Sequence, residues 1–435
     1  STTTGSTTVT VTSAFAITAA AGGYIYHSAF PNCRTSIVSV LTSTTLQVSN
    51  AATATTSSQT FYLDSISSNI KKLYYNNTIY PTVVALTNNN NILIWGSGYQ
   101  GLGVVTNYTQ YFPNLTDIIY TECAISAPYS YNANFPTPSF SVWYKTTTNT
   151  DAIATWGNTF TLGNGVGSSG AGQSYNTYRS TGSSQSTPAN ILVSRTCTTN
   201  AVASGSSTIT VQSALVGVSS GYYISGTGIP SNTYIRQILT STSFSLADSS
   251  GNLITVPSSI SNGTILTYNM LAPGETITDY GVGRQIVTLS NTYTPLPFRL
   301  ILTSTGRLFM FGVLAYSSTT DTQTTLSAPT LFDRNVTKLF MYETPDAQTF
   351  CTLKTDGYIY KYAILDFNVP YRGLYINTPI TNYNFYQPYK TLYNESIYGT
   401  VSDMKHGYVL TTDGKIYALQ NKRVTELSQT LIPYS

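Results

Sequence analysis

A short strand–turn–strand pattern recurs along this 435-residue chain and constrains its fold more than any other feature. Each copy has an apolar run, then a turn rich in Thr, Asn, Asp or Gly, then a second apolar run. Gly306, Gly357 and Gly414 follow the turn in three copies, and glycine supplies the positive φ that two-residue hairpin turns demand. The five copies span residues 84–96, 142–165, 300–312, 351–362 and 408–419. The pattern predicts five hairpins of one type.

A second motif precedes each hairpin and reads apolar, Thr or Lys, polar, apolar, aromatic. Its copies span residues 70–74, 115–119, 277–280, 336–340 and 389–393, and a sixth copy at 424–427 has no hairpin after it. Where nothing is inserted, the units recur about every 45 to 60 residues, a period typical of propellers or solenoids. Because Thr, Val, Ile and Tyr favour strands and Gly, Asn, Pro and Ser punctuate them, we expect an all-β chain.

Two of the hairpins end in sequences that resemble a known repeat. "WGSGYQGLG" at 95–103 and "WGNTFTLGNG" at 156–165 resemble the repeats of the regulator of chromosome condensation family, and 327–340 resembles that family's proline-bearing connector. The resemblance covers roughly residues 58–198 and 270–435, and it implies a β-propeller. That family normally has seven blades, whereas five units are clear here. Residues 424–427 could pair with 59–66 as a composite closing blade, so we expect five to seven blades, with six favoured.

A second kind of repeat lies outside the hairpins. Residues 7–14 match 207–214, residues 22–37 match 221–235, and residues 41–48 match 239–246, with an offset that stays near 200. Alternating Thr and Val predict strands with one buried face and one solvent-exposed face. The second copy resembles a small β module of phage and large-virus structural proteins and of bacterial surface proteins. The predicted organisation is a module at 1–57, blades at 58–198, an inserted module at 199–269 and further blades at 270–435.

Charged residues are scarce, at 9% of the chain against roughly 25% in an ordinary globular protein, and the net charge is +3. A surface of hydroxyls and amides has little long-range repulsion, which suits a protein packed into an assembly or working outside a cell. No clustered Lys and Arg indicate nucleic-acid binding, and no run of 18 apolar residues indicates a membrane span. Cys33, Cys123, Cys197 and Cys351 are far apart, and both disulfides and buried free thiols remain open.

The residues that carry chemistry form no recognisable constellation. His27 and His406 lie in no nucleophile arrangement, and the motif Gly-x-Ser-x-Gly is absent. Asp356 and Asp413 fit turn chemistry, while Asp151, Glu275 and Asp279 show no spacing that suggests a glycosidase pair. We therefore expect no enzyme, no catalytic residue, no cofactor and no metal site.

Two sets of residues are candidates for contact or modification. The chain has 36 tyrosines, and Tyr covers area at low entropic cost while keeping a hydroxyl for hydrogen bonds. The predicted contact surface, for protein or carbohydrate, comprises Tyr371, Tyr375, Tyr383, Phe385, Tyr386 and Tyr389. Six sequons give possible N-glycosylation sites at Asn76, Asn107, Asn114, Asn262, Asn335 and Asn394, a number that chance also explains.

Three functions remain open from the sequence. The first is a non-enzymatic structural or adhesive protein of a virion or extracellular surface, which contacts other subunits, a receptor protein or a glycan. The second is a secreted carbohydrate-binding or carbohydrate-active propeller, which would need a carboxylate pair in a central pocket. The third is an intracellular adaptor or exchange factor, which the family resemblance implies but which needs charged faces that this composition lacks.

Overall fold

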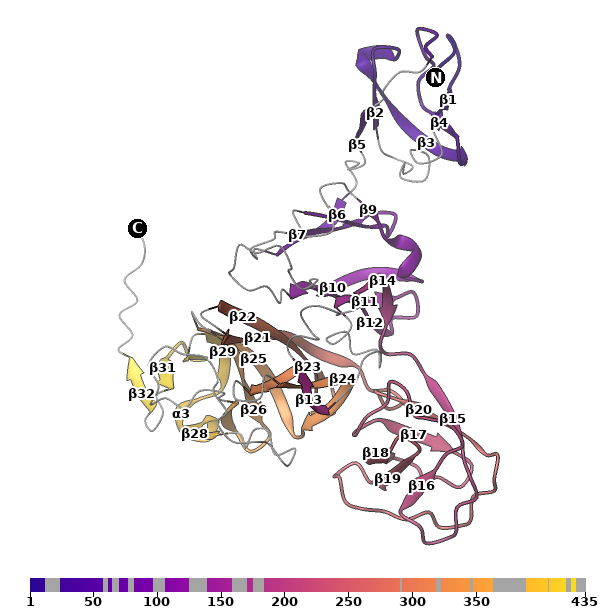
Figure 1. Ribbon diagram of the computed structural model, residues 1–435. Coiled ribbons are helices and arrows are strands. Elements are labelled where there is room, and N and C mark those ends of the chain that lie inside the picture. Colours follow the sequence, from indigo (N-terminus) through magenta and orange to yellow (C-terminus); the bar gives the residue numbers. More distant parts are fainter. Residues whose placement is uncertain are drawn as a thin grey trace. The chain divides into compact units, whose positions relative to one another are not determined.

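The computed structural model describes residues 1–11, 24–57, 62–64, 70–76, 82–96, 106–124, 139–158, 170–174, 184–289, 292–317, 322–344, 347–362, 389–405, 407–419 and 424–427. These residues form six antiparallel sheets (Figure 1). The helices among them are α3 (Glu395–Tyr398) and two single 3-10 turns, η1 (Pro31–Cys33) and η2 (Thr109–Tyr111). The expected all-β fold is confirmed. No helix in this part of the chain is long and apolar enough to span a bilayer.

The chain divides into two compact units, one of residues 1–121 with 144–148 and the other of residues 122–143 with 149–435. The first unit begins with a five-stranded sheet in the order β1-β4-β3-β2-β5. Its strands are β1 (Thr8–Thr10), β2 (Tyr24–Tyr26), β3 (Arg34–Thr42), β4 (Thr45–Val48) and β5 (Tyr62–Asp64). Alternate residues of these strands point inward, so Val9, Ile25 and Leu46 form a buried core. We call this sheet the first module.

The second module is a six-stranded sheet in the second unit, in the order β15-β20-β17-β18-β19-β16. Its strands are β15 (Arg195–Thr198), β16 (Thr208–Thr210), β17 (Tyr223–Gly226), β18 (Thr233–Thr240), β19 (Ser243–Ala247) and β20 (Ile265–Asn269). From β16 to β20 the pairing order matches that of the first module from β1 to β5. The β3–β4 ladder shifts register twice, and the β18–β19 ladder shifts at the two equivalent positions. β15 is an additional strand on the outer side of β20.

Three further sheets are four-stranded meanders, and in one of them β13 is skipped between the third and fourth strands. One joins β6 (Ile70–Asn76), β7 (Thr82–Thr87), β8 (Ile92–Gly96) and β9 (Thr106–Asn107). Another joins β10 (Leu115–Ala124), β11 (Ser139–Thr146), β12 (Asp151–Asn158) and β14 (Ser184–Asn190). The third joins β29 (Val401–Lys405), β30 (Tyr408–Thr411), β31 (Ile416–Leu419) and β32 (Val424–Leu427).

A nine-stranded sheet, which curls on itself in Figure 1, contains two more meanders. The first comprises β21 (Ile277–Leu289), β22 (Thr292–Thr303), β23 (Leu308–Ser317) and β24 (Thr322–Asp333). The second comprises β25 (Val336–Thr344), β26 (Ala347–Lys354), β27 (Tyr358–Tyr362) and β28 (Tyr389–Asn394). A single residue pair, Arg284 with Gln348, joins β21 to β26, and β13 (Gly170–Ser174) adds a strand outside β24. The described residues thus contain five meanders.

The hairpin turns carry one positive-φ residue each, not the two that a type I′ turn requires. That residue is Asn90, Asn149, Gly306, Gly357 or Gly414, with φ between 58° and 82°. In the β22–β23 turn, the Gly306 amide donates to Thr303 O at 2.9 Å and the Arg307 amide donates to Thr303 Oγ1 at 3.3 Å. The predicted hairpins are present, but their turns belong to the longer class with one left-handed residue.

The copy of the second sequence motif at residues 389–393 was wrongly interpreted as the strand that precedes the hairpin at 408–419. Residues 389–393 lie in β28 and residues 424–427 form β32, and both are the last strands of their meanders. The fifth meander begins instead with β29, whose sequence has Ser and Lys where the motif has Thr or Lys and an aromatic residue. Among the described residues β5 pairs with β2 and β32 pairs with β31, and the composite closing blade stays a prediction. The motif specifies an amphipathic strand, and an outer strand satisfies that pattern as well as a first strand does.

Candidate interaction site at the second module

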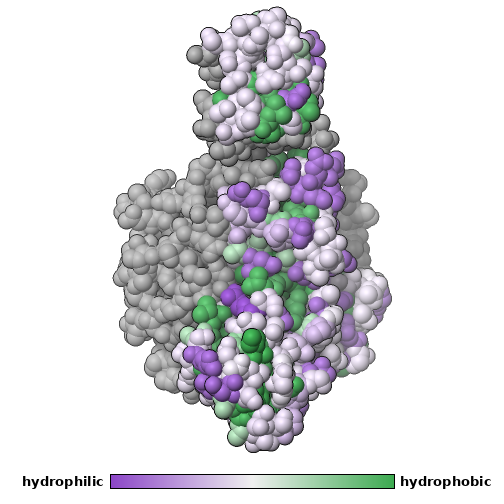
Figure 2. All heavy atoms as spheres, turned by 90° about the vertical axis from the view of Figure 1, so that its right-hand side faces the viewer, coloured by the Kyte–Doolittle hydropathy of each residue, from purple (hydrophilic) through white to green (hydrophobic). Residues whose placement is uncertain are grey.

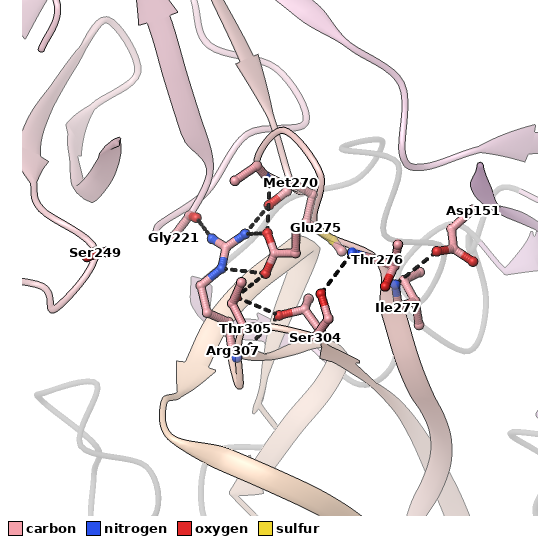
Figure 3. Close-up of polar contacts among 12 residues, drawn as sticks. Asp151, Gly221, Ser249, Met270, Glu275, Thr276, Ile277, Ser304, Thr305 and Arg307 are labelled. Carbon is pink, nitrogen blue, oxygen red and sulfur yellow. Dashed lines mark hydrogen bonds and ion pairs between the residues drawn. The ribbon is translucent and has the colours of Figure 1, made fainter. Parts of the chain in front are cut away.

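The second module is fastened to the β22–β23 turn by a buried ion pair (Figure 3). Arg307 follows the turn, and Glu275 lies in the connector between β20 and β21. The Arg307 guanidinium donates from both Nε and Nη2 to the two Glu275 oxygens, with an Nε–Oε1 distance of 3.0 Å. The side chains are 5% and 1% exposed, so both charges are almost fully desolvated. Such a pair holds its geometry only if the remaining donors and acceptors are also satisfied.

Those remaining groups are satisfied from the module and the connector. Arg307 Nη1 donates to the backbone carbonyl of Gly221, and Nη2 donates to that of Met270 at 2.9 Å. The Glu275 carboxylate also accepts from the Ala272 amide at 2.8 Å and from the Thr305 hydroxyl. Burial alone would raise the pKa of Glu275, but the hydrogen bonds and charge of Arg307 outweigh burial and hold this pKa below its ordinary value.

Aromatic rings enclose the guanidinium. Its central carbon lies 4.9 Å from the ring centroid of Tyr234 in the module and 4.9 Å from that of Phe309 on β23. Tyr222 makes an edge contact with Phe309, with centroids 6.4 Å apart. Stacking on a desolvated cation adds attraction to the ion pair. The Tyr222 hydroxyl is buried and has no hydrogen-bond partner in the described part of the chain.

Backbone contacts complete the junction. The Leu331 amide on β24 donates to Ser220 O at 2.9 Å, and the hydroxyls of Ser219 and Thr330 lie 2.7 Å apart. Gly221 has a φ of 88°, and a Cβ placed on it would collide with the Leu331 side chain. Only glycine permits this approach of the two backbones. The arrangement joins the second module to β23 and β24 through side-chain and backbone contacts.

The carboxylates singled out in the sequence have structural roles. Asp151 accepts from Trp143 Nε1 at 2.7 Å and from the Ile277 amide at 2.9 Å. Asp279 accepts from the Tyr280 amide at 2.8 Å, and burial raises its pKa. Asp356 and Asp413 accept hydrogen bonds in their turns, as expected. The structure brings Asp151 and the Glu275 connector together through the Ile277 amide, but it does not direct these carboxylates at one another.

The modules also carry exposed apolar side chains at matching positions. Leu41 at the end of β3 is 50% exposed, and Leu239 at the equivalent position of β18 is 47% exposed. Val38 and Val40 extend this surface on β3. Figure 2 shows a hydrophobic patch on the first module.

The predicted contact and glycosylation residues are spread over several elements. Tyr371, Tyr375, Tyr383, Phe385 and Tyr386 lie outside the described residues, and Tyr389 begins β28. Asn76 ends β6 and Asn107 ends β9. Asn114, Asn262 and Asn335 are exposed, so a glycan could reach each of them. Asn394 is buried and its side chain caps α3, which leaves no room for a glycan.

The cysteines and histidines show no shared site among the described residues. Cys33, Cys197 and Cys351 are free thiols, and burial raises the pKa of Cys197 to about 11 and that of Cys351 to about 12. His27 Nδ1 accepts from the Ala29 amide at 3.0 Å, and His406 lies outside the described residues. No group of three or more metal-ligating side chains occurs in the part of the chain that the structure covers.

The sequence did not identify Arg307, Tyr222 or Tyr234 as junction residues. The signal for Tyr234 is a difference between the two modules: the ladder partner of Tyr223 is Tyr234, whereas the partner of the equivalent Tyr24 is Ser36. Neither a protein-family model nor a curated protein sequence matches the chain.

Proposed function

We propose that this chain is a non-enzymatic structural protein of a virion or extracellular assembly. In this proposal the five meanders are the blades of a β-propeller, and the two small modules contact neighbouring subunits or a receptor. The proposal rests chiefly on one observation, the exposed leucine that both modules keep at the same place.

The recurrence of the meanders supports the propeller. Four of the first strands carry a register shift at the second motif residue, between Ile70 and Lys72 in β6 and at the equivalent places in β21, β25 and β29. Within the first unit, Lys72 of β6 donates to Asp117 of β10 at 2.7 Å. Within the second unit, Lys338 of β25 donates to the Val401 carbonyl of β29. Linked first strands are expected where blades repeat around an axis.

The exposed leucines support the contact role. The two modules can be aligned with each other within this one chain. Most residues that are the same in both modules have a role in the fold that explains them. Ile37 and Ile235 are core residues, and the Thr42 and Thr240 hydroxyls accept from amides of their turns. Leu41 and Leu239 have no such role, and nearly half of each faces solvent. A large apolar side chain kept at an exposed position favours contact with another molecule.

The test replaces both leucines with serine in the native assembly. The double variant Leu41→Ser with Leu239→Ser should lose most of its incorporation, while its midpoint of thermal unfolding stays close to that of the parent because both positions are exposed. Leu73→Ser provides a matched control, since Leu73 is 59% exposed on β6, outside the modules. Normal incorporation of the double variant would contradict the proposal.

A further inference from the structure

The two exposed leucines are both extra residues at β-bulges. The β3–β4 ladder skips Val38 and Leu41, and the β18–β19 ladder skips Arg236 and Leu239 at the equivalent positions. A bulge leaves its extra residue out of the ladder and re-aims that side chain. Each module therefore has a pair of bulge residues on one strand, and the second residue of the pair is leucine in both modules.

The first residue of the pair differs in its chemistry between the modules. Val38 is apolar and 54% exposed, whereas Arg236 is an exposed cation. Residues 199–269 contain two charged side chains, Arg236 and Asp248. Asp248 is used within its own turn, where its carboxylate accepts from backbone amides at 2.9 Å. No ion pair among the described residues involves Arg236, so the single cation of this segment is available to another molecule.

We propose that the first bulge residue determines which surface each module contacts. In the second module, Leu239 enters an apolar depression of a partner molecule, and Arg236 pairs with a carboxylate at the rim of that depression. In the first module, Val38 and Leu41 contact a surface that is apolar throughout.

The selectivity follows from the cost of mismatched pairs. A guanidinium donates two parallel hydrogen bonds to a carboxylate, which gives the second module its preferred partner. A carboxylate that faced Val38 would lose water without gaining a hydrogen bond, and Arg236 against an apolar surface would suffer the same loss. Two modules of one fold thus bind two different surfaces.

The test measures incorporation into the native assembly, with variants of the full chain that keep both leucines. Arg236→Glu should lower incorporation about tenfold or more, because it places like charges against each other. Val38→Arg should also lower incorporation, since its cation meets no carboxylate. Raising the ionic strength from about 0.05 M to about 0.5 M should weaken incorporation of the parent but not of Arg236→Val, which lacks the charge.

Arg34→Glu is the matched control. Arg34 is the only Lys or Arg of residues 1–57, and it is exposed at the start of β3, outside the bulges. Its reversal changes the net charge as Arg236→Glu does and should leave incorporation unchanged. The midpoint of thermal unfolding should stay close to that of the parent in all four variants, because every substituted side chain is exposed.

Three results would overturn the inference: normal incorporation of Arg236→Glu, normal incorporation of Val38→Arg, or equal losses from Arg34→Glu and Arg236→Glu. The inference rests on the proposed contact role, but the two can fail separately. Normal incorporation of the double leucine variant would overturn both. Loss of the double leucine variant without an effect of Arg236→Glu would overturn the inference alone.

Discussion

The first and second modules have the same strand order and the same register shifts, and they differ in the residues that the second module uses at its junction with the β22–β23 turn. Gly5 and Gly205 have φ values of 79° and 81°, and the Ser6 and Ser206 hydroxyls each bond the second residue after them. The modules differ where Tyr234 of the second corresponds to Ser36 of the first. Core and turn residues therefore specify this module, while Tyr222 and Tyr234 of the second module pack at its junction with β23.

The largest expected effect comes from removing the cation of the junction. Arg307→Met leaves the Glu275 carboxylate buried and unpaired, which should lower the free energy of unfolding of the second unit by about 3 to 5 kcal/mol. Chemical denaturation of the full chain measures this loss. Adding Glu275→Leu should restore most of it, because the double variant buries no charge.

Arg34→Met in the first module is the matched control. Arg34 lies 5.2 Å from the ring centroid of Tyr24 but is exposed, so its loss should cost less than about 1 kcal/mol. Equal effects of the two substitutions would contradict the difference between a buried, paired arginine in the second module's junction and an exposed arginine in the first module.

The second effect tests the close backbone approach. Gly221→Ala places a methyl group against Leu331, and overpacking of this kind costs about 1 to 3 kcal/mol beyond the strain of positive φ. Gly205→Ala has the strain alone, because nothing lies within 4 Å of its added Cβ. The midpoint of thermal unfolding should be clearly lower for Gly221→Ala than for Gly205→Ala. The opposite order would exclude a tight junction at Gly221.

The third effect is pH dependence. The pKa of Glu275 in the folded chain lies below its ordinary value of 4.5, so the pair contributes fully above that pH and its contribution is lost as pH falls through the lowered pKa. The protection factor for amide exchange at residues 219–222, which compares the observed rate with the intrinsic rate at the same pH, should therefore fall as the pH is lowered below 4.5. Glu275→Gln should weaken that dependence. Identical acid sensitivity in the parent and this variant would remove Glu275 as the titrating group.

The smallest effect concerns an unsatisfied hydroxyl. Tyr222→Phe removes a buried group without a partner in the described residues, so stability should stay unchanged or rise by up to about 1 kcal/mol. Tyr393→Phe is the control, because its hydroxyl donates to Gly399 O at 2.8 Å and its removal should cost about 1 kcal/mol. Chemical denaturation measures both variants. A loss at Tyr222 as large as that at Tyr393 would mean that its hydroxyl is hydrogen-bonded.

The features that could be predicted from sequence are local. Gly306, Gly357 and Gly414 mark turns because positive φ is a local requirement, and the alternating Thr and Val residues of both modules mark strands. The motif could not separate first strands from last strands, so β29 was missed. Local patterns of this kind were sufficient to predict the all-β class.

The junction could not be predicted in the same way. Arg307 is 32 residues from Glu275 and 86 from Gly221 in sequence, and nothing in its own segment distinguishes it from an exposed arginine after a turn. Its partners are backbone carbonyls, which every residue has. Comparing the two modules position by position would have identified Tyr234, since an aromatic residue replaces a serine there.

A reconstruction of the native assembly at side-chain resolution tests the central claim most directly. The account predicts blades around one axis, with Leu41 and Leu239 buried against neighbouring molecules and the second module held at Arg307. A map in which both leucines face solvent, and in which no other molecule touches either module, would contradict it.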